Sequence, residues 1–162
     1  MNKTELTARL KEIDLKEYEQ DTGNEWQQNH AKLVERFLNE PEEELETIAQ
    51  VLYGLQDLQV RDYAMGVLDK GNLNHKHALE KLIKYSPAKY LKPAKTLKAL
   101  LWWELGNKEQ AEHLLAQVKG YNLADLLKRT MSAGWASEQF QVMREELHPK
   151  VTAGIFGEMA VA

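Results

Sequence analysis

Residues 95–131 constrain the fold of this chain more than any other stretch, because two helical patterns are joined there by a tight turn and followed by a third. Apolar residues recur at intervals of three and four, the spacing of one helix face. Gly106 is expected to end the first helix in the left-handed conformation that helix C-termini often need. Asn107 is expected to cap the second helix. The predicted face positions of these two arms are Leu97, Leu100, Leu101, Glu104, Leu105, Ala111, Leu114, Leu115 and Val118.

The rest of the 162-residue chain alternates amphipathic segments with stop signals in the same way. Leu, Ala, Glu, Lys and Gln outnumber Val, Ile and Thr, a bias that favours helix over sheet. We therefore predict an all-α protein of about eight or nine short antiparallel helices, arranged as helical hairpins in one domain over residues 1–162. The predicted segments are 4–20, 25–39, 42–55, 58–70, 72–85, 93–105, 107–118, 122–133 and 135–148.

Both ends of the chain are predicted to be less firmly placed than the middle. Residues 1–22 contain a weak amphipathic pattern with Thr4 as its cap and Tyr18 on its apolar side, so we expect a loosely packed N-terminal helix. Pro149 is expected to end the last helix, because proline lacks the backbone N–H and restricts the residue before it. Residues 149–162 have no reliable periodicity and are predicted to be a C-terminal tail, either a docked arm or a loose end.

The chain lacks the residues or motifs that several kinds of catalytic and metal site require. The chain has no cysteine, and therefore no disulfide, no thiolate metal site and no cysteine nucleophile. Its glycines are scattered singly and no serine lies in a nucleophile-elbow pattern. His75 and His77 are two residues apart and so point to different helix faces, which favours solvated side chains over a metal site. We expect no enzyme activity, no cofactor and no metal. Without a membrane span of roughly 20 apolar residues or a secretory leader, we expect a cytoplasmic protein.

Other polar groups are predicted to be structural. His30 shares a helix face with Trp26, so we expect a hydrogen-bonded residue at the edge of the core. Arg61 and Asp62 are predicted to form a structural ion pair near a helix start. The acidic run at 42–46 is predicted to be a solvated first turn, where the helix dipole favours negative charge.

Charge is distributed unevenly along the chain, although the net charge is only −4. Residues 1–61 carry 14 acidic and 7 basic side chains, whereas residues 62–99 carry 3 acidic side chains and 8 lysines. Such a lysine cluster could bind nucleic acid, with Tyr85 and Tyr90 stacking on bases. The lack of arginine argues against this, and a solvated face is the simpler interpretation. Self-association, in which the acidic third of one copy meets the basic middle of another, is a third interpretation.

Trp102 and Trp103 are adjacent, so on a helix they point about 100° apart and cannot both be central to one core stripe. We expect one to lie in the core and the other to pack beside a flanking helix or in a groove, where tryptophan often contributes most to binding. The predicted partner-binding residues are Trp102, Trp103, Lys84, Lys89, Lys92, Lys95, Lys98, Tyr85 and Tyr90.

Two resemblances add to this interpretation. The segment LLWWELGNKEQAEHLLAQV is similar to the middle of a tetratricopeptide repeat, but no second copy occurs at the period of about 34 residues. A second set of motifs comprises Val60-Arg61-Asp62, Trp102–Gly106 with Ala111, Tyr121–Ala124 with Leu126 and Leu127, and Ala133-Gly134 before Trp135.

In these motifs, residues 60–140 resemble the C-terminal helical region of an uncharacterised family of unknown function, found mainly in actinobacteria and their mobile elements. Typical members are longer and carry an N-terminal α/β portion that this chain is expected to lack. The resemblance implies a helical fold and a bacterial or phage setting. It implies no reaction and no functional residues.

We therefore predict a non-enzymatic helical interaction module that binds a protein partner or itself. One alternative is a nucleic-acid-associated or inhibitory protein of a phage or mobile element, which would use the basic segment 70–98. Another alternative is a small enzyme or ligand binder without a recognisable motif.

Overall fold

The computed structural model describes residues 1–19 and 23–158, and every regular element in these ranges is helical, which confirms the predicted all-α class. The elements are α1 (Lys3–Glu19), α2 (Gly23–Asn39), α3 (Leu45–Gly54), α4 (Leu58–Val67), α5 (Leu73–Tyr85), the 3-10 turn η1 (Ala88–Tyr90), α6 (Leu91–Glu104), α7 (Lys108–Leu115), α8 (Asn122–Ser132) and α9 (Ser137–Phe156).

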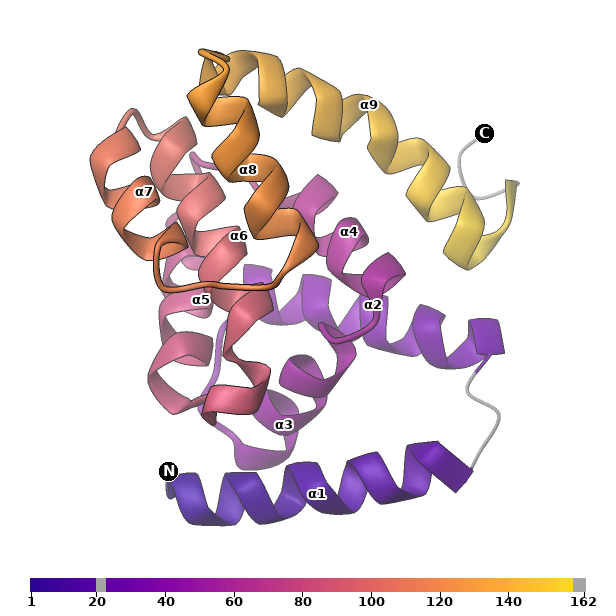
Figure 1. Cartoon of the computed structure of the whole chain (residues 1–162). Helices are drawn as coiled ribbons and strands as arrows, with labels where there is room; N and C mark the ends of the chain where they lie inside the picture. The colour runs from indigo at the N-terminus through magenta and orange to yellow at the C-terminus, as the bar shows by residue number, and fades with distance from the viewer. Residues whose placement is uncertain (20–22, 159–162) are drawn as a thin grey trace.

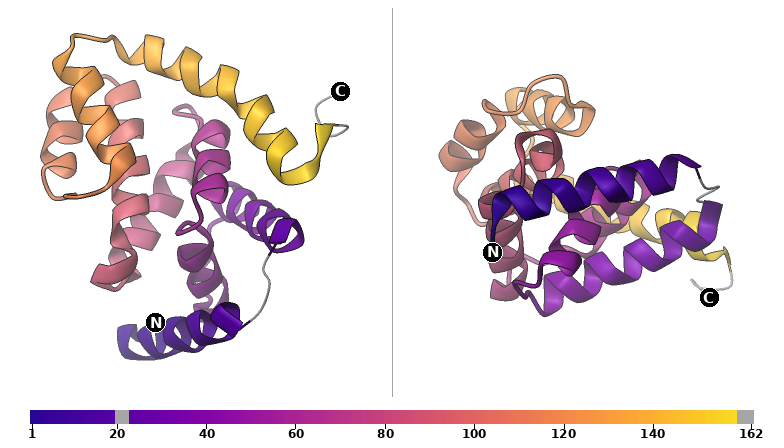
Figure 2. Two further views of the ribbon diagram at one scale, coloured as in Figure 1. Left: turned by 45° about the vertical axis from the view of Figure 1, so that its right-hand side comes forward. Right: turned by 90° about the horizontal axis from the view of Figure 1, so that it is seen from below.

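The helices pack mainly as neighbouring pairs (Figure 1). Helix α6 packs between α5 and α7, α2 contacts α3, α4 and α5, and α1 packs on α3. After α8 the chain turns back, and α9 packs on α4 and also contacts α2. Figure 2 shows α9 in yellow, leading away from α8. The last helix therefore joins the N-terminal and C-terminal halves of the fold.

The turn between α6 and α7 has the predicted geometry. Gly106 has a φ of 85°, in the left-handed region, and the Asn107 side chain accepts a hydrogen bond from the Gln110 backbone N–H at 3.2 Å. The prediction for the end of α6 needs one correction. Leu105 is exposed rather than buried, because the turn carries it off the helix face, whereas the side chain of Glu104 is fully buried.

The prediction that Pro149 ends the last helix is wrong, because α9 continues to Phe156 with Pro149 inside it. Ile155 is fully buried beyond the proline, in a small cluster with Tyr63 and Ala31. This burial offsets the backbone hydrogen bond that a proline removes. Only residues 149–158 of the predicted tail are described, and residues 159–162 lie outside the described ranges.

The beginning of the last helix also differs from the prediction. Trp135 was expected inside this helix but lies in the turn before it, where its side chain is exposed. The helix begins at Ser137, and the Gln139 side chain accepts a hydrogen bond from the Ala136 backbone N–H at 2.8 Å.

The cap of the N-terminal helix lies two residues earlier than expected. Asn2 rather than Thr4 provides the cap, since the Asn2 side chain accepts a hydrogen bond from the Thr4 backbone N–H at 2.7 Å. Leu6 and Leu10 are fully buried against the body of the protein. The side chain of Tyr18 and all of residues 20–22 lie outside the part of the chain that the structure describes.

The acidic run 42–46 is only partly helical. Residues 42–44 precede α3, with Glu44 at the N-cap position, and Glu46 alone lies in the first turn. Glu46 accepts hydrogen bonds from the Arg9 guanidinium at 2.6 and 2.8 Å, which ties α1 to α3.

Candidate functional site

The two adjacent tryptophans occupy different environments, as their helix geometry requires. Trp103 is buried and packs against Phe140, with ring centres 5.8 Å apart. Trp102 is only partly buried, at the outer edge of the core. The Lys76 ammonium lies 4.9 Å from the centre of the Trp102 ring, and the Lys98 ammonium lies 5.4 Å from it. Both distances are within the range of cation–π attraction.

Helices α5 and α6 together present a basic surface around Trp102. Lys95, Lys98 and Trp102 share one side of α6 by their spacing of three, four and seven residues. Lys98 is almost fully buried, and its ammonium donates a hydrogen bond to Glu80 of α5 at 2.8 Å. This bond lowers the pKa of the Glu80 carboxyl. We call the surface formed by Lys76, Glu80, Lys81, Lys84, Lys95, Lys98 and Trp102 the α5–α6 face.

A hollow of about 350 Å³ adjoins this face, where α5 meets the loop between α2 and α3. Glu43, in that loop, accepts a hydrogen bond from Lys81 at 2.8 Å, which lowers the pKa of its carboxyl. The hollow thus contains two carboxylates that are already bound to lysines, with further cationic side chains around them. Its lining residues are Pro41, Glu43, His77, Glu80, Lys81 and Lys84.

Only part of the predicted partner-binding set comes together in the fold. Lys92 lies ten residues before Trp102 on the same helix, about 15 Å away along its axis, and Lys89 lies further back in η1. Lys76, which the prediction omitted, contacts Trp102 instead. Its position depends on how α5 pairs with α6, and no pattern within α6 indicates it.

The two tyrosines that the nucleic-acid alternative would use for stacking lie inside the protein. Tyr85 and Tyr90 are buried in the core, with exposed fractions of 8% and 6%. Their rings therefore offer no open face on which a nucleobase could stack. The nucleic-acid hypothesis therefore loses the two aromatic side chains that it would use for stacking.

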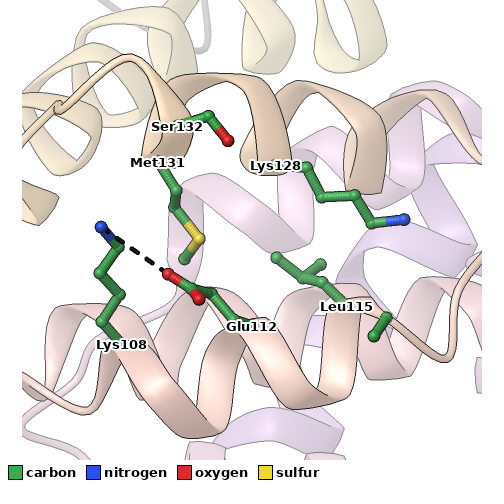
Figure 3. Close-up of a pocket in the computed structure, with 7 residues that line it drawn as sticks. Lys108, Glu112, Leu115, Lys128, Met131 and Ser132 are labelled. Atoms are coloured by element: carbon green, nitrogen blue, oxygen red, sulfur yellow. Dashed lines mark ion pairs between the residues drawn. The ribbon is translucent and has the colours of Figure 1, made fainter.

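A second concave site lies between α7 and α8 and was not predicted (Figure 3). This pocket of about 300 Å³ has Leu115 and Met131 pointing into it, and both side chains are otherwise well packed. Lys108 and Glu112 form an ion pair of 3.7 Å across one side. The Lys128 ammonium donates a hydrogen bond to the Val118 carbonyl at 2.8 Å. The pocket offers an apolar floor with a charged rim.

The most buried charges of the described chain are structural. Arg144 of α9 donates hydrogen bonds to both carboxylate oxygens of Glu104, at 2.8 and 2.7 Å, and a third to the Met65 carbonyl at 2.8 Å. This pair joins α9 to α6 and α4, and both side chains have almost no solvent exposure. No local sequence pattern predicts this pair, since 40 residues separate the partners.

The histidine and arginine predictions have mixed outcomes. His30 is hydrogen-bonded at the core edge as predicted, with Nε2 2.9 Å from Gln50 Oε1. Arg61 and Asp62 form the predicted ion pair at 2.7 Å. The prediction that His75 is solvated is wrong, because its ring is buried and bridges two segments. Its Nδ1 accepts a hydrogen bond from the Asp69 backbone N–H at 3.0 Å, and its Nε2 lies 2.8 Å from Asn39 Oδ1.

Burial lowers the pKa of His75, which agrees with the neutral tautomer that this hydrogen bonding requires. No three His, Asp or Glu side chains come together as a candidate metal site among the described residues. Within the same residues, no helix has the length and apolar content to cross a membrane.

These features define the class of protein. It is a single all-α chain of paired helices, and its most deeply buried charged side chains bind one another or a backbone carbonyl. The chain belongs to the family described as a domain of unknown function, DUF4192, whose sequence profile matches residues 2–138. The expected assignment to an uncharacterised family is thereby confirmed, and the match also includes the N-terminal third. The actinobacterial setting and the tetratricopeptide likeness remain predictions. No curated protein and no solved structure matches the chain.

Proposed function

We propose that this protein is a non-enzymatic helical interaction module that binds a protein partner at the α5–α6 face. The observation that carries the proposal is the position of Trp102, a large aromatic side chain that the core covers only in part. Tryptophan is enriched among the residues that contribute most to protein–protein binding. Lys76 and Lys98 lie over its ring, so the same surface combines apolar area with positive charge.

The helices beneath this face make it a firm platform. Ala94, Leu97 and Leu101 of α6 are buried, and Leu79 and Leu82 of α5 are buried beside them. A side chain held on packed helices loses little conformational freedom when a partner binds, which favours affinity. The chain itself is one candidate partner, since its acidic N-terminal third complements this basic face in charge.

The proposal is tested by comparing two tryptophan variants. Trp102→Ala removes the aromatic side chain of the α5–α6 face, whereas Trp135→Ala removes an exposed tryptophan in the turn before α9. Tagged wild-type and variant proteins are used to capture partners from the source cells, and light scattering measures self-association of each. We expect Trp102→Ala to reduce recovery of one partner, or the fraction of dimer, at least roughly tenfold.

Trp135→Ala is the matched control and should behave as the wild type. Thermal unfolding of each variant shows whether the fold is retained. Equal recovery by all three proteins, with no change in self-association, would contradict the proposal.

A further inference from the structure

We propose that the segment bound at the α5–α6 face is an acidic peptide segment, and that Glu43 and Glu80 compete with it for the lysines of this face. This inference rests on the proposed function, because it names the chemistry of the partner at the same site. It follows from the charges of the face, from the exposure of the two glutamates and from the space between them.

Positive charge exceeds negative charge in the lining of this site. Four lysines act electrostatically on the two carboxylates that line the hollow, those of Glu43 and Glu80. The surface therefore keeps a positive excess even when both ion pairs are formed, and it attracts acidic groups over distances of about a Debye length. These lysines are Lys76, Lys81, Lys84 and Lys98, whereas the Lys95 ammonium donates a hydrogen bond to Gln117 at 2.8 Å.

The two glutamates are more open to water than the lysines they bind. The Glu43 side chain is 54% exposed and the Glu80 side chain is 45% exposed, whereas their lysine partners are 28% and 8% exposed. Water can solvate either carboxylate when it leaves its lysine, but the packed Lys81 and Lys98 still need a negative partner. Each glutamate can therefore rotate outward when a carboxylate of the bound segment takes its place.

The hollow leaves room for a carboxylate of the bound segment. The hollow of about 350 Å³ lies between the two carboxylates and has Lys84 and His77 on its wall. A carboxylate from a partner can enter there and replace Glu43 at Lys81 or Glu80 at Lys98. Since Lys98 also lies over the Trp102 ring, an apolar side chain next to that carboxylate would cover the tryptophan. The site thus fits a segment that alternates acidic and apolar residues.

A nucleic acid fits the same surface less well. Its phosphates form a continuous line of negative charge, which Glu43 and Glu80 would repel. The tyrosines that could stack on bases are buried, and the face has no arginine for bidentate phosphate contacts. A peptide can place its carboxylates singly, between the glutamates, and is therefore the better match.

The test measures fluorescence anisotropy with three labelled probes: a peptide of alternating Glu and Leu, the same peptide with Lys in place of Glu, and a single-stranded oligonucleotide. We expect only the acidic peptide to bind with appreciable affinity, and its affinity to fall as salt is added. Glu43→Gln and Glu80→Gln should each tighten binding by roughly two- to fivefold, because each removes a competitor. Lys81→Gln and Lys84→Gln should weaken it.

Glu109→Gln is the matched control, because it removes one exposed carboxylate from α7, outside the α5–α6 face. It changes the net charge by the same amount as Glu80→Gln, so equal tightening by both variants would overturn the competition and leave only a general charge effect. Absence of binding by the acidic peptide at low salt, or tighter binding of the oligonucleotide, would overturn the acidic-segment proposal.

The two proposals fail separately. If Trp102→Ala abolishes partner capture but no glutamate or lysine variant changes it, the interaction function stands and the acidic segment is wrong. If neither kind of variant changes partner capture, both are wrong.

Discussion

At the scale of single residues, Arg144 joins α9 to α6 and α4 through one buried guanidinium. Its guanidinium makes three hydrogen bonds, two to Glu104 and one to the Met65 carbonyl, in a region without solvent. A buried ion pair adds little net stability compared with well-packed apolar residues, but removing one partner leaves the other charged and unsolvated. The identity of residue 144 therefore matters mainly because of the carboxylate that it neutralises.

We expect Arg144→Ala to lower the free energy of unfolding by about 3–5 kcal/mol, because Glu104 is left buried without its partner. Urea unfolding measures the change. The double variant Arg144→Leu with Glu104→Leu should recover most of the loss, and Arg129→Ala, at an exposed position of α8, serves as the control. A single Arg144→Ala variant as stable as Arg129→Ala would show that the pair is not buried as described.

At the scale of one element, α9 packs on α4 through a close approach between His148 and Gly66. His148 lies against Gly66 of α4, so closely that a Cβ on Gly66 would overlap the imidazole ring. The ring lies 5.1 Å from that of Tyr63, and its Nδ1 is buried without a hydrogen-bond partner among the described residues. Burial lowers the pKa of His148, with Arg144 acting in the same direction and Glu35 opposing it.

This lowered pKa predicts how stability depends on pH. Unfolded chains bind a proton on His148 more readily than the folded protein, so the contribution is complete above the ordinary histidine pKa of 6.5 and is lost as pH falls through the lower folded value. His75 contributes with the same sign. We expect the wild type to lose stability between about pH 7.5 and about pH 5.5, and His148→Leu to lose less.

Urea unfolding at both pH values, with the exposed His113→Gln as control, measures this difference. An equal loss in wild type and His148→Leu would show that the neutral form of His148 does not stabilise α9. Gly66→Ala offers a second check, since overlap with the imidazole should cost about 1–3 kcal/mol and should be relieved by His148→Ala.

At the scale of the whole molecule, the family match ends before the packed helices do. The match ends at residue 138, one residue after the first residue of α9, whereas α9 continues to Phe156. Phe140 and Arg144, which lie beyond the match, are both fully buried against residues within it. The region 2–138 therefore depends on a helix of which the family profile covers only the first two residues.

We expect a fragment of residues 1–138 to lose cooperative unfolding, because Trp103 would lose its ring contact and Glu104 its buried partner. Near-ultraviolet circular dichroism and thermal unfolding measure this loss. A fragment of residues 1–156, which ends where α9 ends, should unfold like the whole chain. A cooperative transition in the 1–138 fragment would show that α9 is dispensable for the core.

Local features of this protein were predictable from the sequence alone, because they depend on residues that are close in the chain. The left-handed turn at Gly106, the Asn107 cap and the separation of Trp102 from Trp103 all follow from backbone conformation and helical spacing. The same short-range rules gave the all-α class and most helix limits.

Tertiary structure alone decided the features that join distant segments. Arg144 meets Glu104 across 40 residues, His75 meets Asn39 across 36, and Lys76 reaches Trp102 only because α5 packs against α6. Pro149 remains helical because burial of Ile155 outweighs a local preference. The physical reason is the same in each case: local propensities are worth a few tenths of a kcal/mol to about 1 kcal/mol per residue, whereas burial and charge pairing are worth more and depend on which helices meet.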